Sequence, residues 1–156
     1  MHELLAALQG LAPIEALRFA RWGYAAVNTL HVFAIALLVG GSVPMALRLL
    51  GLWPGVPRAA VVRVLAISAG SGLALAVISG FLLFATRAPE YSHNPAFQLK
   101  LELIALGATS AMLAHRRHGS TLEGASDAVA RRVGAISVLC WIGALVSGRL
   151  IAFVQG

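Results

Sequence analysis

Apolar residues along this chain are gathered into long blocks rather than spread at short periods. Four blocks are apolar almost throughout, and each is near the roughly 20 residues that a helix needs to cross a 30 Å hydrocarbon core. They cover about residues 23–47, 64–86, 96–114 and 133–154. Because backbone in lipid must satisfy its own hydrogen bonds, the pattern predicts four transmembrane helices. Pro44 and Gly80 do not oppose this, since membrane helices tolerate both residue types.

The stretches between the blocks have the composition of turns and loops. They read GLWPGVPRAA, TRAPEYSHNP and RRHGSTLEGASDAVARR, and they are rich in glycine, proline and polar residues. Short connectors of this kind place consecutive helices side by side and antiparallel. The sequence therefore predicts an all-α fold, an integral membrane up-down four-helix bundle over residues 22–156.

The first 21 residues follow a different pattern. Leu4 and Leu8 belong to a series of leucines at helical spacing, with charged residues mostly between them. The segment is too polar to cross a bilayer, so residues 1–21 are predicted to form an amphipathic helix that lies in the membrane interface. Trp22 and Tyr24 then mark the headgroup level at which the first span begins.

Small residues recur on one face of the predicted helices. Lipid gives no hydrophobic drive for helix association, so close backbone approach is needed to hold such helices together. The residues concerned are Ser68, Gly72, Ala76 and Gly80 in the second span, Gly107 and Ala111 in the third, and Gly134, Ser137, Ala144 and Gly148 in the fourth. We expect these faces to form the helix contacts of the bundle.

Composition supports a membrane protein and argues against a nucleic-acid partner. Hydrophobic residues make up 59% of the 156 residues and charged residues only 12%, against about 25% charged in a typical soluble domain. The net charge is +6, but eleven of the twelve basic residues are arginines in or near the connectors and span ends. Membrane topology explains arginines in such places. The single cysteine, Cys140, allows no disulfide within the chain.

The distribution of arginine and lysine predicts the orientation. Seven of these residues fall on the side that holds the first and third connectors, and five fall on the other side. Basic residues in short loops favour the cytoplasmic face. We therefore expect a multi-pass protein of a bacterial inner membrane with both termini on the periplasmic side.

Two ionisable residues lie inside the predicted spans. His31 is about two turns into the first span, on one helix face with Tyr24 and Asn28, and Lys100 is one turn into the third. Both spans start on the same side, so the two side chains are expected at similar depth. A lysine at the bilayer centre costs about 2.5–3.5 kcal/mol on the insertion scale, which makes such residues functional hypotheses by default. The alternatives are structural: His31 bonds a backbone carbonyl, and Lys100 snorkels to the interface or pairs with Glu90.

Other candidate residues carry weaker signals. His93, in the second connector, is a further possible metal ligand on the outer side, whereas His115 and His118 lie beside two arginines that repel a cation. Arg87 and Arg149 lie at the same outer end as His31 and could bind carboxylates by charge-assisted hydrogen bonds. The chain has no glycine-rich phosphate loop and no two-cysteine metal motif.

The stretches LHVFAIALLVGG, LRLLG, YSHNPAFQLKLELIAL and LAHRR together resemble an uncharacterised family of small four-helix bacterial membrane proteins. More distantly, the chain resembles the HemJ-type protoporphyrinogen oxidases and the CopD-like copper-resistance domains. In the HemJ type, a histidine near the start of the first helix and a lysine near the start of the third are implicated in holding a b-type haem. The resemblance implies that His31 and Lys100 are haem iron ligands here, with haem b as the cofactor.

Three functions follow as hypotheses. The first is haem binding for electron transfer or a linked oxidation, with Arg87 and Arg149 meeting the haem propionates and Tyr24 and Asn28 near the site. The second is a non-catalytic membrane subunit or assembly partner without a cofactor, either a homo-oligomer or bound to another membrane protein. The third is handling of copper or a small solute through His31 and His93. Whether the chain is an enzyme is left open by the sequence.

Overall fold

The computed structural model describes residues 2–154, and every regular element in that range is a helix. The helices, in chain order, are α1 (His2–Gln9), α2 (Ala12–Phe19), α3 (Arg21–Leu50), α4 (Arg58–Thr86), α5 (Ala88–Ser92), α6 (Pro95–His118) and α7 (Asp127–Leu150). The predicted all-α class is confirmed.

The helices α3, α4, α6 and α7 correspond to the four predicted spans. Each is long and apolar enough to cross a membrane, and α3 continues without interruption through Pro44. Helix α7 begins earlier than its apolar block, because Ser126 caps it by accepting a hydrogen bond from the Val129 N–H. It ends at Leu150, whereas the predicted span extends to residue 154.

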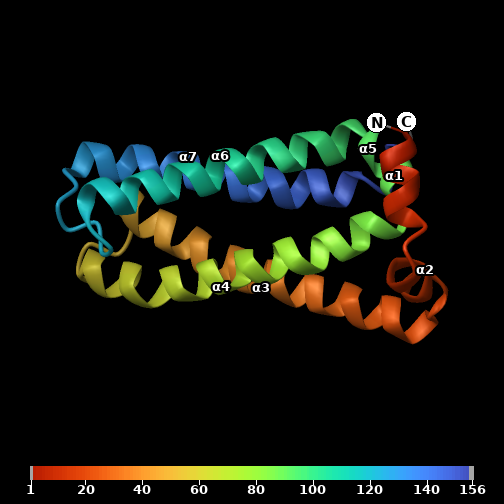
Figure 1. Ribbon diagram of the computed structural model, residues 1–156. Helices are drawn as coiled ribbons and strands as arrows, with labels where there is room; N and C mark the ends of the chain where they lie inside the picture. The colour runs from red at the N-terminus through yellow and green to blue at the C-terminus, as the bar shows by residue number, and fades with distance from the viewer. Residues whose placement is uncertain (1, 155–156) are drawn as a thin grey trace.

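The long helices form two antiparallel hairpins, α3–α4 and α6–α7 (Figure 1). Helix α3 packs against both α4 and α7, and α7 packs against both α3 and α6, so the hairpins meet along α3 and α7. Within the described residues the backbones of α4 and α6 are not in contact. We call the end with the α3–α4 and α6–α7 connectors the loop end, and the end with α1, α2 and α5 the terminal end (Figure 1).

Glycines allow the helices to approach at backbone distance. A Cβ atom on Gly41 would lie 2.8 Å from the Ala69 nitrogen of α4, and one on Gly72 would collide with the Leu38 backbone nitrogen of α3. A Cβ on Gly134 of α7 would lie 2.8 Å from a carbonyl oxygen of α3. The predicted small-residue faces of the second and fourth spans therefore do form helix contacts, and these contacts lie within the chain.

The interior is small and the outer surface is apolar. At the loop end the core contains Met45, Leu49 and Val62, and Trp141 fills the middle of the bundle, where Gly107 makes room for its ring. Large apolar side chains point outward, and Ile67 and Leu139 are each 72% exposed. Such a surface suits lipid rather than water, because a soluble protein rarely exposes large contiguous apolar patches.

The N-terminal residues form two short helices rather than one. Helix α1 ends at Gln9 and α2 begins at Ala12, and both lie across the terminal end of the bundle (Figure 1). The side-chain amide of Gln9 donates a hydrogen bond to the Thr86 carbonyl at the end of α4, and Ile14 is buried. Trp22 is 81% exposed, as expected of a residue at the headgroup level, and the interfacial position of this segment stays a prediction.

Three aromatic rings join α4, α5 and α6 at the terminal end. Phe84 and Phe97 stack with their centroids 5.3 Å apart, and Tyr91 stacks on Phe97 at 5.9 Å. Burial raises the pKa of the Tyr91 phenol above its ordinary value of 10, and the neighbouring Tyr24 raises it further. The folded state therefore favours the neutral phenol.

This raised pKa predicts a loss of stability at high pH. A group whose pKa is higher in the folded state stabilises the fold below its unfolded pKa, and that contribution is lost as the pH rises from about 10 through the folded pKa. The unfolding midpoint of the wild type should therefore fall between pH 9 and pH 11 more steeply than that of Tyr91→Phe, which keeps the stacked ring. Equal slopes of unfolding midpoint against pH for the two proteins would show that ionisation of Tyr91 does not contribute to the loss of stability.

Candidate functional site

His31 lies on the face of α3 that packs against α4, in the half of the bundle nearer the terminal end. Its ring lies over Gly80 of α4, where a Cβ atom would be 2.9 Å from the imidazole Cε1. The imidazole Nδ1 is 2.9 Å from the hydroxyl oxygen of Ser79, which is fully buried. The absence of a side chain at Gly80 thus creates the space in which the ring is held.

The hydrogen bonds of Ser79 indicate which ring nitrogen carries the proton. The Ser79 hydroxyl donates to the Leu75 carbonyl at 2.6 Å, the usual back-bond of a helical serine to the fourth preceding residue. Its single proton is thereby used, so the hydroxyl oxygen accepts from His31 Nδ1–H. The Ala76 carbonyl is a second acceptor near the ring. In neutral imidazole with Nδ1 protonated, Nε2 carries the lone pair.

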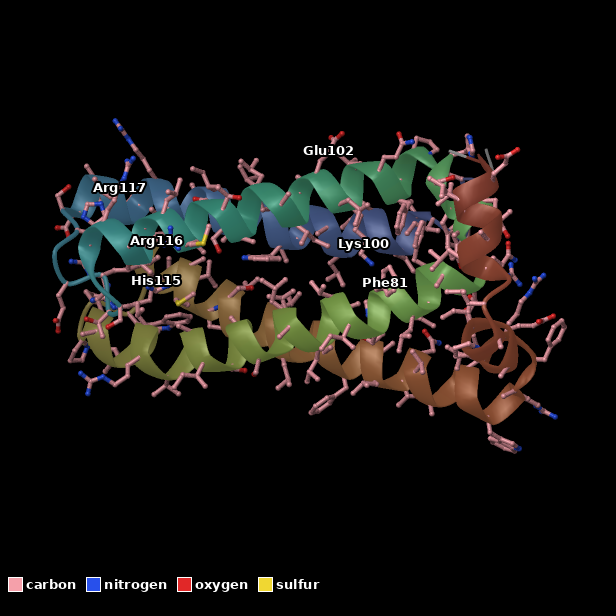
Figure 2. All side chains as sticks on the ribbon, in the orientation of Figure 1. Phe81, Lys100, Glu102, His115, Arg116 and Arg117 are labelled. Carbon is pink, nitrogen blue, oxygen red and sulfur yellow. The ribbon has the colours of Figure 1, made fainter. Side chains whose placement is uncertain are left out.

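Lys100 lies on α6, and the start of that helix fixes its depth. The Asn94 side chain caps α6 by accepting hydrogen bonds from the Ala96 and Phe97 N–H groups, and its amide donates to the Ile151 and Val154 carbonyls after α7. One turn later the Lys100 stem crosses Gly148 of α7, with Cδ 3.5 Å from where a Cβ atom would be. Figure 2 shows the amine directed from α6 toward the α3–α4 hairpin.

The structure brings the two ionisable side chains near each other. The Lys100 amine is close enough to act electrostatically on the His31 ring, although the two residues come from different hairpins. Among residues 2–154, Lys100 has neither a hydrogen bond nor an ion pair. An ion pair between Lys100 and Glu90, one of the alternatives from the sequence, is not formed. The Glu90 carboxylate instead pairs with Arg87, with Oε1 3.6 Å from the guanidinium Nη1. Glu102 points away from the bundle on the opposite side of α6 (Figure 2).

The polar neighbours of the imidazole come from α4 rather than from its own helix. Asn28 is exposed, and in the described part of the chain its side chain forms no hydrogen bond. Tyr24 is half-buried and lies beside Tyr91 of α5. The residues that contact the His31 ring are Ser79 and Gly80, and a role of Tyr24 and Asn28 in cofactor binding stays a prediction.

The remaining candidates at the terminal end have local contacts. The Arg87 and Glu90 side chains are 57% and 65% exposed, so their ion pair contributes little to stability. Arg149 lies over the Phe153 ring, 5.1 Å from its centroid. His93 Nδ1 lies 3.0 Å from the Pro89 carbonyl oxygen within its own connector. No cluster of three or more His, Cys, Asp or Glu side chains suited to a metal occurs among residues 2–154.

By their chemistry, His31 and Lys100 are the residues that would hold a haem iron at this site. A neutral imidazole with a lone pair on Nε2 is a known protein ligand of haem iron, and the Lys100 amine has no hydrogen-bond or ion-pair partner among residues 2–154. The two cavities described lie at the loop end, and neither is lined by His31 or Lys100.

Ser79 was not among the residues predicted from the sequence, and Gly80 was singled out only as a packing residue. The sequence shows small residues along the second span but does not show which of them faces His31. That assignment needs the relative depth of α3 and α4, which the connector length alone does not fix. No family model, curated protein or solved structure matches this chain.

Proposed function

We propose that this chain is a polytopic bacterial inner-membrane protein that binds a b-type haem between its two hairpins, with His31 and Lys100 as the iron ligands. The observation that carries the proposal is the hydrogen-bonded series from His31 to Ser79 to the Leu75 carbonyl. It orients the imidazole and leaves Nε2 as a lone-pair donor. Metal-binding histidines commonly donate their other ring N–H to a neighbouring oxygen in this way.

The position of Lys100 supports the same proposal. An amine inside an apolar span with no acid partner is costly. The Lys100 side chain packs on Gly148 of α7. Its charge acts on the His31 ring of the other hairpin. Coordination of the neutral amine would satisfy its lone pair and remove the cost of a buried charge.

Haem would supply one-electron chemistry at this site. The chain's own contribution is to orient the imidazole through Ser79 and to exclude water by the surrounding apolar helices. Arg87 and Arg149 are arginines at the terminal end that could bind the haem carboxylates. Their present contacts, with Glu90 and the Phe153 ring, are weak enough to be replaced by contacts to a ligand. In the proposed orientation this end faces the periplasm.

Absorption spectroscopy of detergent-purified protein from haem-replete cells tests the proposal. We expect a Soret band in the wild type, loss of most of that band in His31→Ala, and no change in His93→Ala. His93 is a matched control because it is an exposed imidazole outside the long helices. A colourless wild type, or a band that His31→Ala leaves intact, would contradict haem binding through this residue.

The alternative of a cofactor-free subunit loses one of its arguments. Its sequence support was the small-residue faces, and several of their glycines contact helices of the same chain. Copper handling through His31 and His93 has no support from the described residues, since they contain no metal cluster. Copper handling has no specific observation in its favour. The cofactor-free alternative is consistent with the hydrogen bonds of the His31 ring to Ser79 and to the Ala76 carbonyl.

A further inference from the structure

A cleft at the loop end carries an inference that is independent of the His31 site. It has a volume of about 490 Å³ and lies between the first turns of α4 and the end of α6, where the α6–α7 connector begins. This is the side of the bundle on which the backbones of α4 and α6 are not in contact. The cleft is open to the surroundings, so a ligand could enter it without rearrangement of the helices.

Part of the cleft lining is apolar. It comprises Val62, Ala66 and Ile67 of α4; Val62 is fully buried in the core, and Ala66 and Ile67 are the accessible members. Ile67 is 72% exposed, so in a membrane this apolar lining continues into the surface that acyl chains would cover. A free, fully hydrated anion gains nothing from such a lining, whereas the first carbons of a lipid tail would be buried against it.

The polar lining residues carry hydrogen-bond donors. They are Arg63, which lies on α4 beside the apolar residues, His115 of α6, and Ser120 and Thr121 of the α6–α7 connector. Figure 2 shows His115 on the side of α6 that faces α4. Among the described lining residues none is acidic. Guanidinium, imidazole N–H and hydroxyl donors together suit the oxygens of a phosphate ester.

Arg63 differs from Arg48 and Arg58, the other arginines near the α3–α4 connector, because it has no structural partner. Arg48 donates to the Val56 carbonyl, and Arg58 donates to the Ala125 carbonyl and pairs with Asp127. Both of those arginines tie the connectors to the bundle. Within residues 2–154, Arg63 makes no hydrogen bond and no ion pair, so its guanidinium is available to a ligand.

We propose that this cleft binds the phosphate headgroup of an anionic phospholipid, with Arg63 as the main contact and the first part of an acyl chain against Ala66 and Ile67. The predicted orientation places the loop end at the cytoplasmic leaflet. Basic pockets between membrane helices on that side are suited to anionic headgroups.

Lipid binding to Arg63→Gln tests this assignment, with Arg131→Gln as the matched control. Arg131 is an exposed arginine at the same end that does not line the cleft. Native mass spectrometry of the detergent-purified protein should show one retained phosphatidylglycerol in the wild type and in Arg131→Gln. In Arg63→Gln the affinity should fall about fivefold or more, the effect of at least one surface basic residue.

Two further arms separate the sources of the phosphate. Phosphatidylcholine should bind at least fivefold more weakly than phosphatidylglycerol, and inorganic phosphate at equal concentration should not displace the lipid. Equal losses in Arg63→Gln and Arg131→Gln would overturn the proposal, because they would show a general surface charge effect. Displacement by inorganic phosphate would also overturn it, because the apolar lining would then play no part.

Discussion

Gly72→Ala is expected to destabilise the α3–α4 hairpin strongly, although it adds only one methyl group. The new Cβ atom would collide with the Leu38 backbone nitrogen and lie 2.8 Å from the Ala34 carbonyl oxygen. Backbone atoms cannot rotate away as a side chain can, so the two helices must separate along their length. Overpacking of a close contact costs about 1–3 kcal/mol, and we expect a value at the upper end of this range.

The matched control for this variant is Gly70→Ala on the same helix. A Cβ atom on Gly70 would meet nothing within 4 Å, so the two substitutions differ in packing and not in helix propensity. Reversible unfolding in mixed micelles should show a lower midpoint for Gly72→Ala and a nearly unchanged one for Gly70→Ala. Equal midpoints for the two variants would mean that the close α3–α4 crossing is absent.

If His31 holds haem as proposed, Gly80→Ala is expected to weaken haem binding while leaving the fold in place. Its Cβ atom would lie 2.9 Å from His31 Cε1, and the ring can turn aside, so the bundle need not open. The displaced ring would lose its hydrogen bond to Ser79. Loss of an orienting partner typically lowers metal affinity by about 10–100-fold, and we expect haem affinity to fall within that range.

The same control serves this second prediction. Haem titration of the purified proteins, followed in the Soret region, should give similar affinities for the wild type and Gly70→Ala and a much weaker one for Gly80→Ala. Unfolding midpoints measured in parallel should agree among the three proteins. If Gly80→Ala binds haem as the wild type does, the ring position over Gly80 is not part of the binding site.

The fold could be predicted from the sequence because its signals are local. Long apolar blocks and glycine- or proline-rich connectors define the helices and their order without knowledge of tertiary contacts. The breaks that hydropathy does not show were harder to predict. The polar first turn of α7 depends on the local hydrogen bond by which Ser126 caps the helix, and the N-terminal segment is divided into α1 and α2 between Gln9 and Ala12.

The candidate site could be predicted only in part, because it is made of contacts between helices. His31 and Lys100 stand out as ionisable residues in apolar spans, and the structure places them near each other. The sequence assigned the neighbours of His31 to its own helix, through Tyr24 and Asn28. The observed neighbours, Ser79 and Gly80, depend on the crossing of α3 and α4 at Gly41 and Gly72, which no periodicity within one helix reveals.

The arginines of the loop end also show what the sequence predicts and what only the structure reveals. The excess of arginines there is visible in the sequence and predicts the orientation. The structure adds that Arg48 and Arg58 bind backbone carbonyls of the connectors, whereas Arg63 lines an open cleft. A count of basic residues does not separate these two roles, because it contains no information on hydrogen-bond partners.

The proposed haem site depends most on the protonation of one imidazole, and nitrogen NMR of His31 in lipid bilayers measures it directly. With ¹⁵N-labelled histidine, and His31→Gln to assign the signal, we predict a protonated Nδ1 and an unprotonated Nε2 in the ligand-free protein at neutral pH. Ser79→Ala should change the Nδ1 signal. A proton on Nε2 instead, donated to the Ala76 carbonyl, would place the lone pair on Nδ1, which is held against the Ser79 hydroxyl, and would contradict the proposed role of Nε2 as a ligand.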